Sequence, residues 1–240
     1  MSTAPLMQVT DLVAGYGEIR ALHGLTFAVA PREIVAVLGA NGAGKTTLLS
    51  SIAGLVRRFS GSVTFDGRSI EAAAAQDIVA SGLVMVPEGG KLFPFMTVRE
   101  NLELGAFSRG ARKRMAQSLD EMFELFPILA QRSRQMAGSL SGGERTMCAI
   151  ARGVMSCPTL LMLDEPSLGL SPKMVESVFE LVRTLANRRQ MAILLVEQNV
   201  GDALQLASRG LVIEQGRIVK AGASADLLGD VAVQNAYLGL

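Results

Sequence analysis

Apolar residues in this chain gather in short blocks bounded by glycine, proline or charged residues, a pattern typical of β-strands. The blocks fall at residues 6–9, 25–29, 34–38, 61–65, 83–86, 160–163 and 192–196. Those at 34–38, 160–163 and 192–196 are apolar throughout, which indicates strands buried on both faces of a sheet. All are much shorter than the roughly 18 residues of a membrane-spanning helix. The pattern predicts a buried sheet and no transmembrane segment.

Between these blocks the spacing favours helices. A helix is expected over residues 46–55, another over 201–207, and residues 97–154 are rich in helix-forming residues without strand signals. Residues 210–214 and 216–220 predict a hairpin turning near Gln215-Gly216. A single apolar stripe predicts a further helix, with Val175, Val178, Phe179, Val182 and Leu185 on one face. Strands that alternate with helices predict an α/β fold with a mainly parallel sheet.

Composition narrows the class of protein. With 240 residues, 49% of them hydrophobic and 19% charged, the chain can bury a substantial core. Its 23 basic and 22 acidic residues give a net charge of +1, so no overall field attracts nucleic acid. Two cysteines, Cys148 and Cys157, and no cleavable apolar leader argue against a secreted disulfide scaffold, so we expect a cytoplasmic setting.

A glycine-rich turn between the strand at 34–38 and the following helix matches the G-x-x-x-x-G-K-[ST] motif in full, reading Gly39-Ala40-Asn41-Gly42-Ala43-Gly44-Lys45-Thr46, with Thr47 next. Its backbone N–H groups and the helix N-terminus can converge on a polyphosphate. Lys45 can neutralise the β and γ phosphates, and the Thr46 hydroxyl can ligate Mg²⁺. A turn without a ligand is the alternative, but the strand–turn–helix context favours a nucleoside triphosphate site.

The apolar strand at 160–163 ends in two acidic residues, Asp164 and Glu165. Buried strands rarely end in paired carboxylates unless both are solvated or paired. Alone, the pair could simply begin a loop. Beside the glycine-rich loop, however, Asp164 can hold Mg²⁺ and Glu165 can orient or activate the attacking water.

Leu140-Ser141-Gly142-Gly143-Glu144 resembles the signature sequence of ATP-binding cassette ATPases, and with the preceding motifs the resemblance covers essentially the whole chain. It implies that Tyr16 stacks on adenine and that Ser141, Gly142 and Gly143 contact ATP bound by a second subunit. From the residues alone, Tyr16 could equally be a turn residue, and the glycines a helix cap. The resemblance also implies a nucleotide site made by Gly39, Asn41, Gly42, Ala43, Gly44, Lys45, Thr46 and Thr47, catalysis by Glu165, Gln198 and Lys45, and Mg²⁺ ligands Thr46, Glu88 and Asp164.

The implied fold is that of a P-loop NTPase, with a mixed, mainly parallel sheet, an antiparallel β subdomain and an inserted helical subdomain. The cassette would span residues 1–240. Its core and antiparallel part would comprise residues 1–96 and 155–240, and the helical signature subdomain about 97–154.

Three positions depart from the common cassette pattern. Glu88 stands where Gln is usual, Gln198 where most members have His, and Ser171 where Asp is usual. The one histidine, His23, lies elsewhere in the sequence. Gln198 can donate an amide N–H to the γ-phosphate but cannot carry a proton or a charge, which places more weight on Glu165.

These departures together resemble the smaller ATPase subunit of branched-chain amino acid importers, as does the ending Ala236-Tyr237-Leu238-Gly239; Gly90 stands where that branch usually has Arg. The resemblance implies an ATPase at the cytoplasmic face of the inner membrane that powers uptake through separate permease subunits. It implies a second ATPase subunit, identical or different, and a solute-binding protein as an indirect partner. Importers for urea and short amides share much of the pattern and remain an alternative.

Other functions are less favoured. A cassette ATPase in assembly or repair would tend to carry long insertions, coiled coils or a basic surface. A P-loop metabolite kinase would need a substrate pocket in place of the Ser141 segment. A regulatory nucleotide-binding module without turnover is disfavoured by intact Lys45, Asp164 and Glu165.

Overall fold

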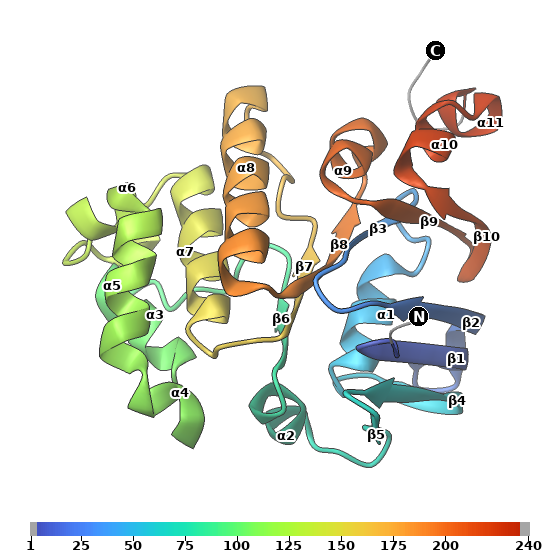
Figure 1. The fold of residues 1–240 in the computed structure, drawn as a ribbon, viewed down its shortest axis with the longest axis horizontal. Coiled ribbons are helices and arrows are strands. Elements are labelled where there is room, and N and C mark those ends of the chain that lie inside the picture. Colours follow the sequence, from blue (N-terminus) through green and yellow to red (C-terminus); the bar gives the residue numbers. More distant parts are fainter. Residues whose placement is uncertain (1–3, 236–240) are drawn as a thin grey trace.

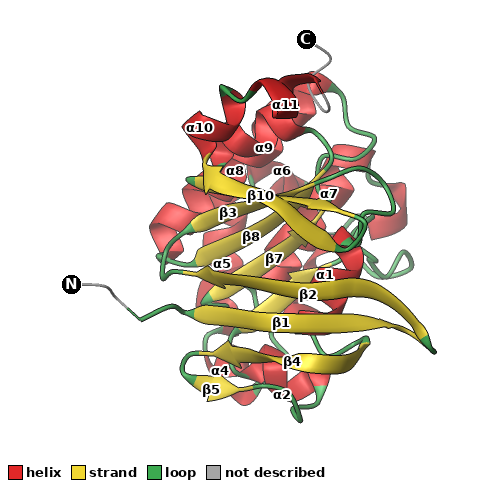
Figure 2. Ribbon diagram, turned by 90° about the vertical axis from the view of Figure 1, so that its right-hand side faces the viewer, coloured by secondary structure: helices red, strands yellow, loops and turns green. Residues whose placement is uncertain are grey.

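A computed structural model of the protein describes residues 4–235; the ending at 236–239 that contributes to the resemblance lies outside them. The described strands form two sheets (Figure 2). The larger sheet has the order β10-β9-β3-β8-β7-β6. Its strands are β3 (Ile34–Leu38), β6 (Leu83–Val86), β7 (Leu160–Asp164), β8 (Ala192–Glu197), β9 (Arg209–Glu214) and β10 (Arg217–Ala223). Neighbours pair in parallel except β9 and β10, which form the predicted hairpin.

The apolar runs of this sheet are explained by burial on both of its faces. Along β7, Leu160 and Met162 join one core cluster, whereas Leu161 and Leu163 join the other. Strands β3 and β8 alternate between the same two clusters. Because side chains alternate across a strand, a strand covered on both sides needs apolar residues at every position. The prediction of buried parallel strands is confirmed.

The smaller sheet is antiparallel and has the order β2-β1-β4-β5. It contains β1 (Met7–Tyr16), β2 (Ile19–Val29), β4 (Arg57–Phe65) and β5 (Arg68–Ser69). The apolar blocks at 6–9, 25–29 and 61–65 predicted only part of this sheet. The rest of β1 and β2 mixes buried with exposed positions, since one face packs on the core and the other faces solvent.

The described helices gather on the faces and at one side of the larger sheet (Figure 1). They are α1 (Lys45–Ile52), α2 (Ala75–Ala80), α3 (Val98–Gly105), α4 (Arg109–Lys113), α5 (Met115–Leu125), α6 (Pro127–Gln131), α7 (Gly142–Val154), α8 (Pro172–Arg189), α9 (Val200–Leu206), α10 (Ser224–Leu228) and α11 (Val231–Val233), with a 3₁₀ turn at Ala137–Ser139. Among residues 4–235, no helix is both long and apolar enough to cross a membrane.

Residues 97–154 contain α3 to α7 without a strand of either sheet, in line with the expected helical segment. Helix α3 begins with a capping box in which the side chains of Thr97 and Glu100 each accept from the other residue's backbone N–H. In Figure 1 these helices lie on the side opposite the antiparallel sheet. The predicted fold class is confirmed, and we propose the division at residues 97 and 154 as the boundary of an inserted helical subdomain.

Candidate functional site

The sheet register brings the predicted catalytic segments to one edge. Leu38 at the end of β3 pairs with Glu197, and Asp164 at the end of β7 pairs with Val196. The loops that follow β3, β7 and β8 therefore leave the sheet side by side. In open α/β sheets, ligands bind beyond the carboxyl ends of the strands. The glycine-rich loop, Glu165 and Gln198 all emerge at this edge.

The loop from Gly39 to Gly44 needs glycine at two close approaches. A β-carbon on Gly39 would lie 2.3 Å from the carbonyl oxygen of Ile213. Gly44 has a φ of +105°, and a β-carbon there would lie 2.9 Å from the Leu22 side chain. Gly44 is also the N-cap of α1, where no side chain of the described residues caps the helix. The first N–H groups of α1 are thus available to an anionic ligand.

A cavity of about 320 Å³ lies beside this loop. Its lining comprises Ala21, Asn41, Gly42, Gly44, Lys45, Thr46, Thr47, Glu88, Glu165 and Leu168. The predicted phosphate-loop residues therefore share one cavity with the predicted catalytic carboxylate. The lining given by residues 4–235 leaves out Tyr16, Gly39, Ala43, Asp164, Gln198 and the Ser141 segment.

Lys45 and Glu165 form a buried ion pair. Lys45 Nζ lies 3.0 Å from Glu165 Oε1, and the two side chains are 3% and 9% exposed. The same ammonium donates to the carbonyl oxygens of Gly39, at 2.7 Å, and Ala40, at 3.1 Å. All three acceptors are oxygens, as phosphate oxygens would be, so a bound polyphosphate can replace them as the ammonium's partner.

Asp164 lies next to the Thr46 hydroxyl. Thr46 Oγ1 donates to Asp164 Oδ1 at 3.1 Å, whereas Asp164 Oδ2 is buried and without a hydrogen-bond partner among residues 4–235. The pKa of Asp164 is raised to about 6, mainly by burial. The charges of Glu165 and Glu88 contribute to the increase, whereas the Thr46 hydrogen bond and Lys45 oppose it. A carboxylate oxygen without a partner beside a hydroxyl suits a hard divalent cation such as Mg²⁺.

Glu88 lies exposed at the rim of the cavity, in the loop after β6. The loop is held by Arg152 of α7, whose guanidinium donates to the carbonyl oxygens of Gly90, at 2.5 Å, and Lys91, at 3.0 Å. Gly90 has a φ of +69°, and a β-carbon there would lie 2.5 Å from that of Ala149. This loop conformation therefore requires glycine at position 90.

The Ser141 segment forms the N-terminus of α7. Ser141 is the N-cap: its hydroxyl accepts from the N–H of Glu144, and the Glu144 carboxylate accepts from the N–H of Ser141 at 2.9 Å. Ser141 and Gly142 are exposed. The helix-cap interpretation of this segment thus holds within the chain, and its contact with the nucleotide of another subunit stays a prediction.

Tyr16 ends β1 and pairs with Ile19 at the tip of the hairpin between β1 and β2. Its side chain is 55% exposed. The neighbouring strand β2 supplies Ala21 to the cavity wall, so the hairpin borders the cavity. Stacking of the Tyr16 ring on adenine stays a prediction.

Sequence reasoning missed Ala21, Leu168 and Glu197. The first two line the cavity as ordinary apolar residues, and no sequence signal distinguishes them. Glu197 is different, because it ends an otherwise apolar buried strand as Asp164 does. The signal that identified Asp164 therefore also applies to Glu197.

The sequence of this chain is similar to those of known proteins. The family model described as "ABC transporter" matches residues 22–168. The chain is 44% identical to the high-affinity branched-chain amino acid transport ATP-binding protein BraG of Pseudomonas aeruginosa, over 93% of this chain and 95% of that protein. It is 34% identical to the probable branched-chain amino acid transport ATP-binding protein LivF of Archaeoglobus fulgidus, over 98% and 99% of the two chains.

The fold is also similar to that of solved structures. One is an ATP-binding cassette of an ABC transporter, MJ1267, in its ADP conformation, with a TM-score of 0.83, 25% identity, and coverage of 99% of this chain and 100% of that one. The family model spans more than half of the present chain, and the two relatives match nearly all of it. The chain therefore belongs to the ABC transporter family.

Proposed function

We propose that this chain is the ATP-hydrolysing subunit of an ABC importer that powers uptake of branched-chain amino acids through a separate membrane permease. The observation that carries the proposal is the cavity that joins Lys45 and Thr46 to Glu165, in a chain 44% identical to a branched-chain amino acid transport ATP-binding protein. We place it at the cytoplasmic face of the membrane, held there by the permease.

In this proposal the P-loop backbone and Lys45 bind the phosphates of ATP. Thr46 and Asp164, with Glu88 at the rim, would hold Mg²⁺, which neutralises charge on the phosphates when bound. Glu165 orients a water molecule and accepts its proton as the water oxygen attacks the γ-phosphorus and the bond to the departing ADP oxygen breaks. When phosphate replaces Glu165 as the partner of Lys45, the carboxylate becomes free to accept that proton.

Gln198 is expected to assist hydrolysis without exchanging protons. Replacing Gln198 with Ala should lower kcat about tenfold, since one neutral hydrogen bond to the transferred phosphoryl group is lost. The shape of the pH–rate profile should stay unchanged, because an amide does not titrate near neutral pH. Steady-state ATPase assays across about pH 5–8, the range over which histidine would change its charge, would measure both.

The matched control is Gln131→Ala, at the exposed end of α6. It should keep the wild-type rate. A wild-type rate for Gln198→Ala as well would assign Gln198 a structural role.

We propose that two cassettes act together, this chain with an identical or different ATPase subunit. The N-terminus of α7 supports this, because Ser141 and Gly142 are exposed and do not line the chain's own cavity, and the groups at a helix N-terminus can contact an anion. In the closed dimer these groups would contact the γ-phosphate held by the other subunit. The solute-binding protein is an indirect partner, through the permease.

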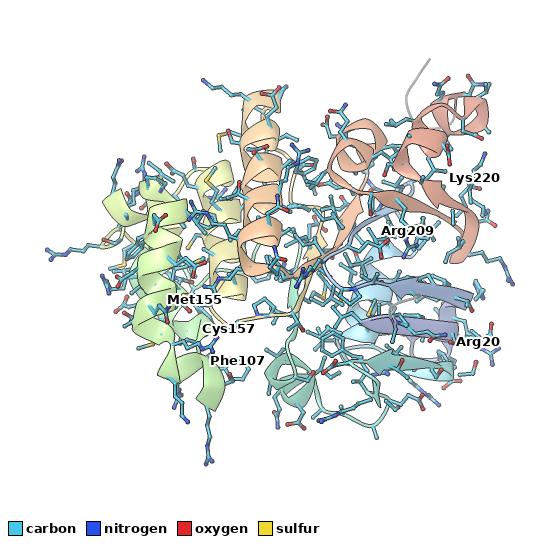
Figure 3. All side chains as sticks on the ribbon, in the orientation of Figure 1. Arg20, Phe107, Met155, Cys157, Arg209 and Lys220 are labelled. Carbon is cyan, nitrogen blue, oxygen red and sulfur yellow. The ribbon has the colours of Figure 1, made fainter. Side chains whose placement is uncertain are left out.

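The permease is expected to dock in a groove between β6 and the helices α3 and α7. The groove has a volume of about 330 Å³ and is lined by residues that include Met85, Leu104 and Phe107. Phe93 and Phe107 are 52% and 46% exposed, and Phe107 follows α3 (Figure 3). The groove also includes Lys91 and Phe93 from the segment after β6. Exposed aromatic side chains around a groove are typical of a protein-binding surface.

Arg152 connects this groove to the cavity. It lines the groove, its guanidinium lies 5.9 Å from the centre of the Phe93 ring, and it holds the loop that carries Glu88. A change at the phosphates could therefore reach a docked permease helix through the loop that carries Glu88 and through Arg152. Differential affinity of the permease for the two nucleotide states would then drive transport.

Uptake of labelled leucine tests the whole proposal. The chain is reconstituted in proteoliposomes with a second ATPase subunit, permease subunits and a solute-binding protein from the same organism. Leucine accumulation that requires ATP supports the proposal, whereas accumulation of urea or acetamide alone, or failure to associate with a permease, contradicts it.

Phe107→Asp is expected to lower leucine uptake about tenfold or more, because a charge in the groove opposes docking of an apolar helix. Val231→Asp is the matched control, since Val231 is a similarly exposed apolar residue on α11. The control should transport normally. Equal uptake by both variants would exclude this groove as the docking site.

A further inference from the structure

Glu197 is a buried carboxylate without a role in the mechanism above. It is the last residue of β8 and is 1% exposed. Its pKa is raised to about 7, mainly by burial and also by the charge of Glu165, although the hydrogen bonds from Ser167 oppose the increase. A carboxylate in such a place costs stability that an apolar residue would not, so its presence needs an explanation.

Both of its oxygens are used by one residue of the loop after β7. The Ser167 N–H donates to Glu197 Oε1 at 2.9 Å, and the Ser167 hydroxyl donates to Oε2 at 2.7 Å. This two-point contact fixes the orientation of the serine as well as its position. It joins residues 30 apart in the chain, one at the end of β8 and the other in the loop after the neighbouring strand β7.

The loop held in this way carries the proposed catalytic carboxylate. Glu165 has a φ of +46°, and its backbone N–H donates to the carbonyl oxygen of Val196 at 2.9 Å. A positive φ is unfavourable for glutamate and persists only where its surroundings impose it. Leu168, which lines the cavity, donates its N–H to the Glu165 carbonyl oxygen at 3.1 Å. Ser167 thus lies within the turn that sets the backbone of Glu165.

We propose that Glu197 is a positioning residue for ATP hydrolysis: by holding Ser167 it keeps Glu165 in its strained backbone conformation and fixes that carboxylate relative to the adjacent Gln198. The inference rests on the catalytic roles proposed for Glu165 and Gln198. Glu197 is 1% exposed and does not line the cavity, so it acts on the attacking water only through Glu165 and Gln198. An error of about 1 Å in the position of a catalytic group can cost roughly 100-fold in rate.

The test compares variants that keep or remove the acceptors for Ser167, using ATPase kinetics of the full chain purified together with its second ATPase subunit. Glu197→Leu removes both acceptors and should lower kcat about 10- to 100-fold, with KM for ATP changed less than about twofold. Glu197→Gln keeps an oxygen for the Ser167 N–H, and its amide can donate to the hydroxyl, so kcat should stay within about threefold of wild type. A residue that served folding alone would give no such split between kcat and KM.

Ser167→Ala completes the comparison, because it removes one of the two contacts without enlarging a core side chain. It should lower kcat about two- to fivefold, and the double variant with Glu197→Leu should be no slower than Glu197→Leu alone. Ser224→Ala is the control: it removes another buried serine hydrogen bond, to the Ala207 carbonyl oxygen at 2.7 Å. Its kcat should equal that of wild type.

Three results would overturn the inference. One is a wild-type kcat in Glu197→Leu, and another is a Glu197→Gln enzyme as slow as Glu197→Leu. If Glu197→Leu does not fold, a wild-type kcat in Ser167→Ala is the third. Glu165→Gln, assayed in parallel, separates this inference from the proposed function, since normal hydrolysis by Glu165→Gln would contradict the role of Glu165 itself.

Discussion

Replacing Glu165 with Gln is expected to lower ATP hydrolysis about 10³-fold while ATP still binds, because the amide has the shape of the carboxylate but cannot accept the proton of the attacking water. The cavity, the P-loop backbone and the partners of Lys45 at Gly39 and Ala40 remain in place. ATP should therefore hold two cassettes together without being cleaved. Single-turnover hydrolysis and size-exclusion chromatography with Mg²⁺ and ATP measure the two effects.

Glu71→Gln is the matched control for that experiment, since Glu71 is an exposed glutamate that follows β5 and does not line the cavity. It should hydrolyse ATP at the wild-type rate and form no ATP-dependent dimer beyond that of wild type. Full activity in Glu165→Gln would show that Glu165 is not the catalytic base and that another group accepts the proton of the attacking water. Loss of both hydrolysis and ATP binding would instead point to a site disrupted by loss of the Lys45 ion pair.

The residues of the site that could be predicted from the sequence lie in short motifs that also predict the local secondary structure. Lys45 and Thr46 follow a buried strand and begin a helix, so the motif specifies both their type and their place. Asp164 and Glu165 end another buried strand. Because parallel strands bring their carboxyl ends to one edge, the two segments were expected to meet, and Thr46 does contact Asp164.

Contacts that join distant segments could not be predicted in this way. Arg152 reaches the carbonyl oxygens of Gly90 and Lys91 across 62 and 61 residues, through the packing of α7 against the loop after β6. Nothing local to Arg152 distinguishes it from a solvated arginine near the end of a helix. Glu197 was also missed, although its place at the end of a buried strand was visible, because its partner Ser167 is set by strand order and not by spacing.

The antiparallel sheet illustrates a different limit. Apolar blocks mark buried strands well, but β1 and β2 extend through half-buried and exposed positions that resemble loop sequence. Their pairing is irregular, with shifts of register between Val9 and Leu12 and again near Ala14. Bulges of this kind break the two-residue alternation on which strand prediction depends. The order of the strands in this sheet therefore had to be taken from the structure. The position of Ala21 beside the cavity follows from that order.

Lys45→Ala is expected to weaken ATP binding about 10- to 100-fold, because the variant loses a charge-assisted contact to the phosphates. The buried pair predicts a second effect. With the ammonium gone, Glu165 is left almost buried without its cation, which destabilises the fold by about 3–5 kcal/mol if the carboxylate stays in place. The double variant with Glu165→Gln removes the unpaired charge and should recover much of the melting temperature, but none of the affinity for ATP.

Isothermal titration with a non-hydrolysable ATP analogue and thermal unfolding separate these two effects, with Lys113→Ala, an exposed lysine at the end of α4, as the control. If Lys45 serves the phosphates, affinity falls in both Lys45 variants regardless of stability. If it served only to neutralise Glu165, the double variant would bind ATP as wild type does. Unchanged affinity in Lys45→Ala would contradict the assignment of the glycine-rich loop as a phosphate site, because there the cation and the helix N-terminus act on the same anion.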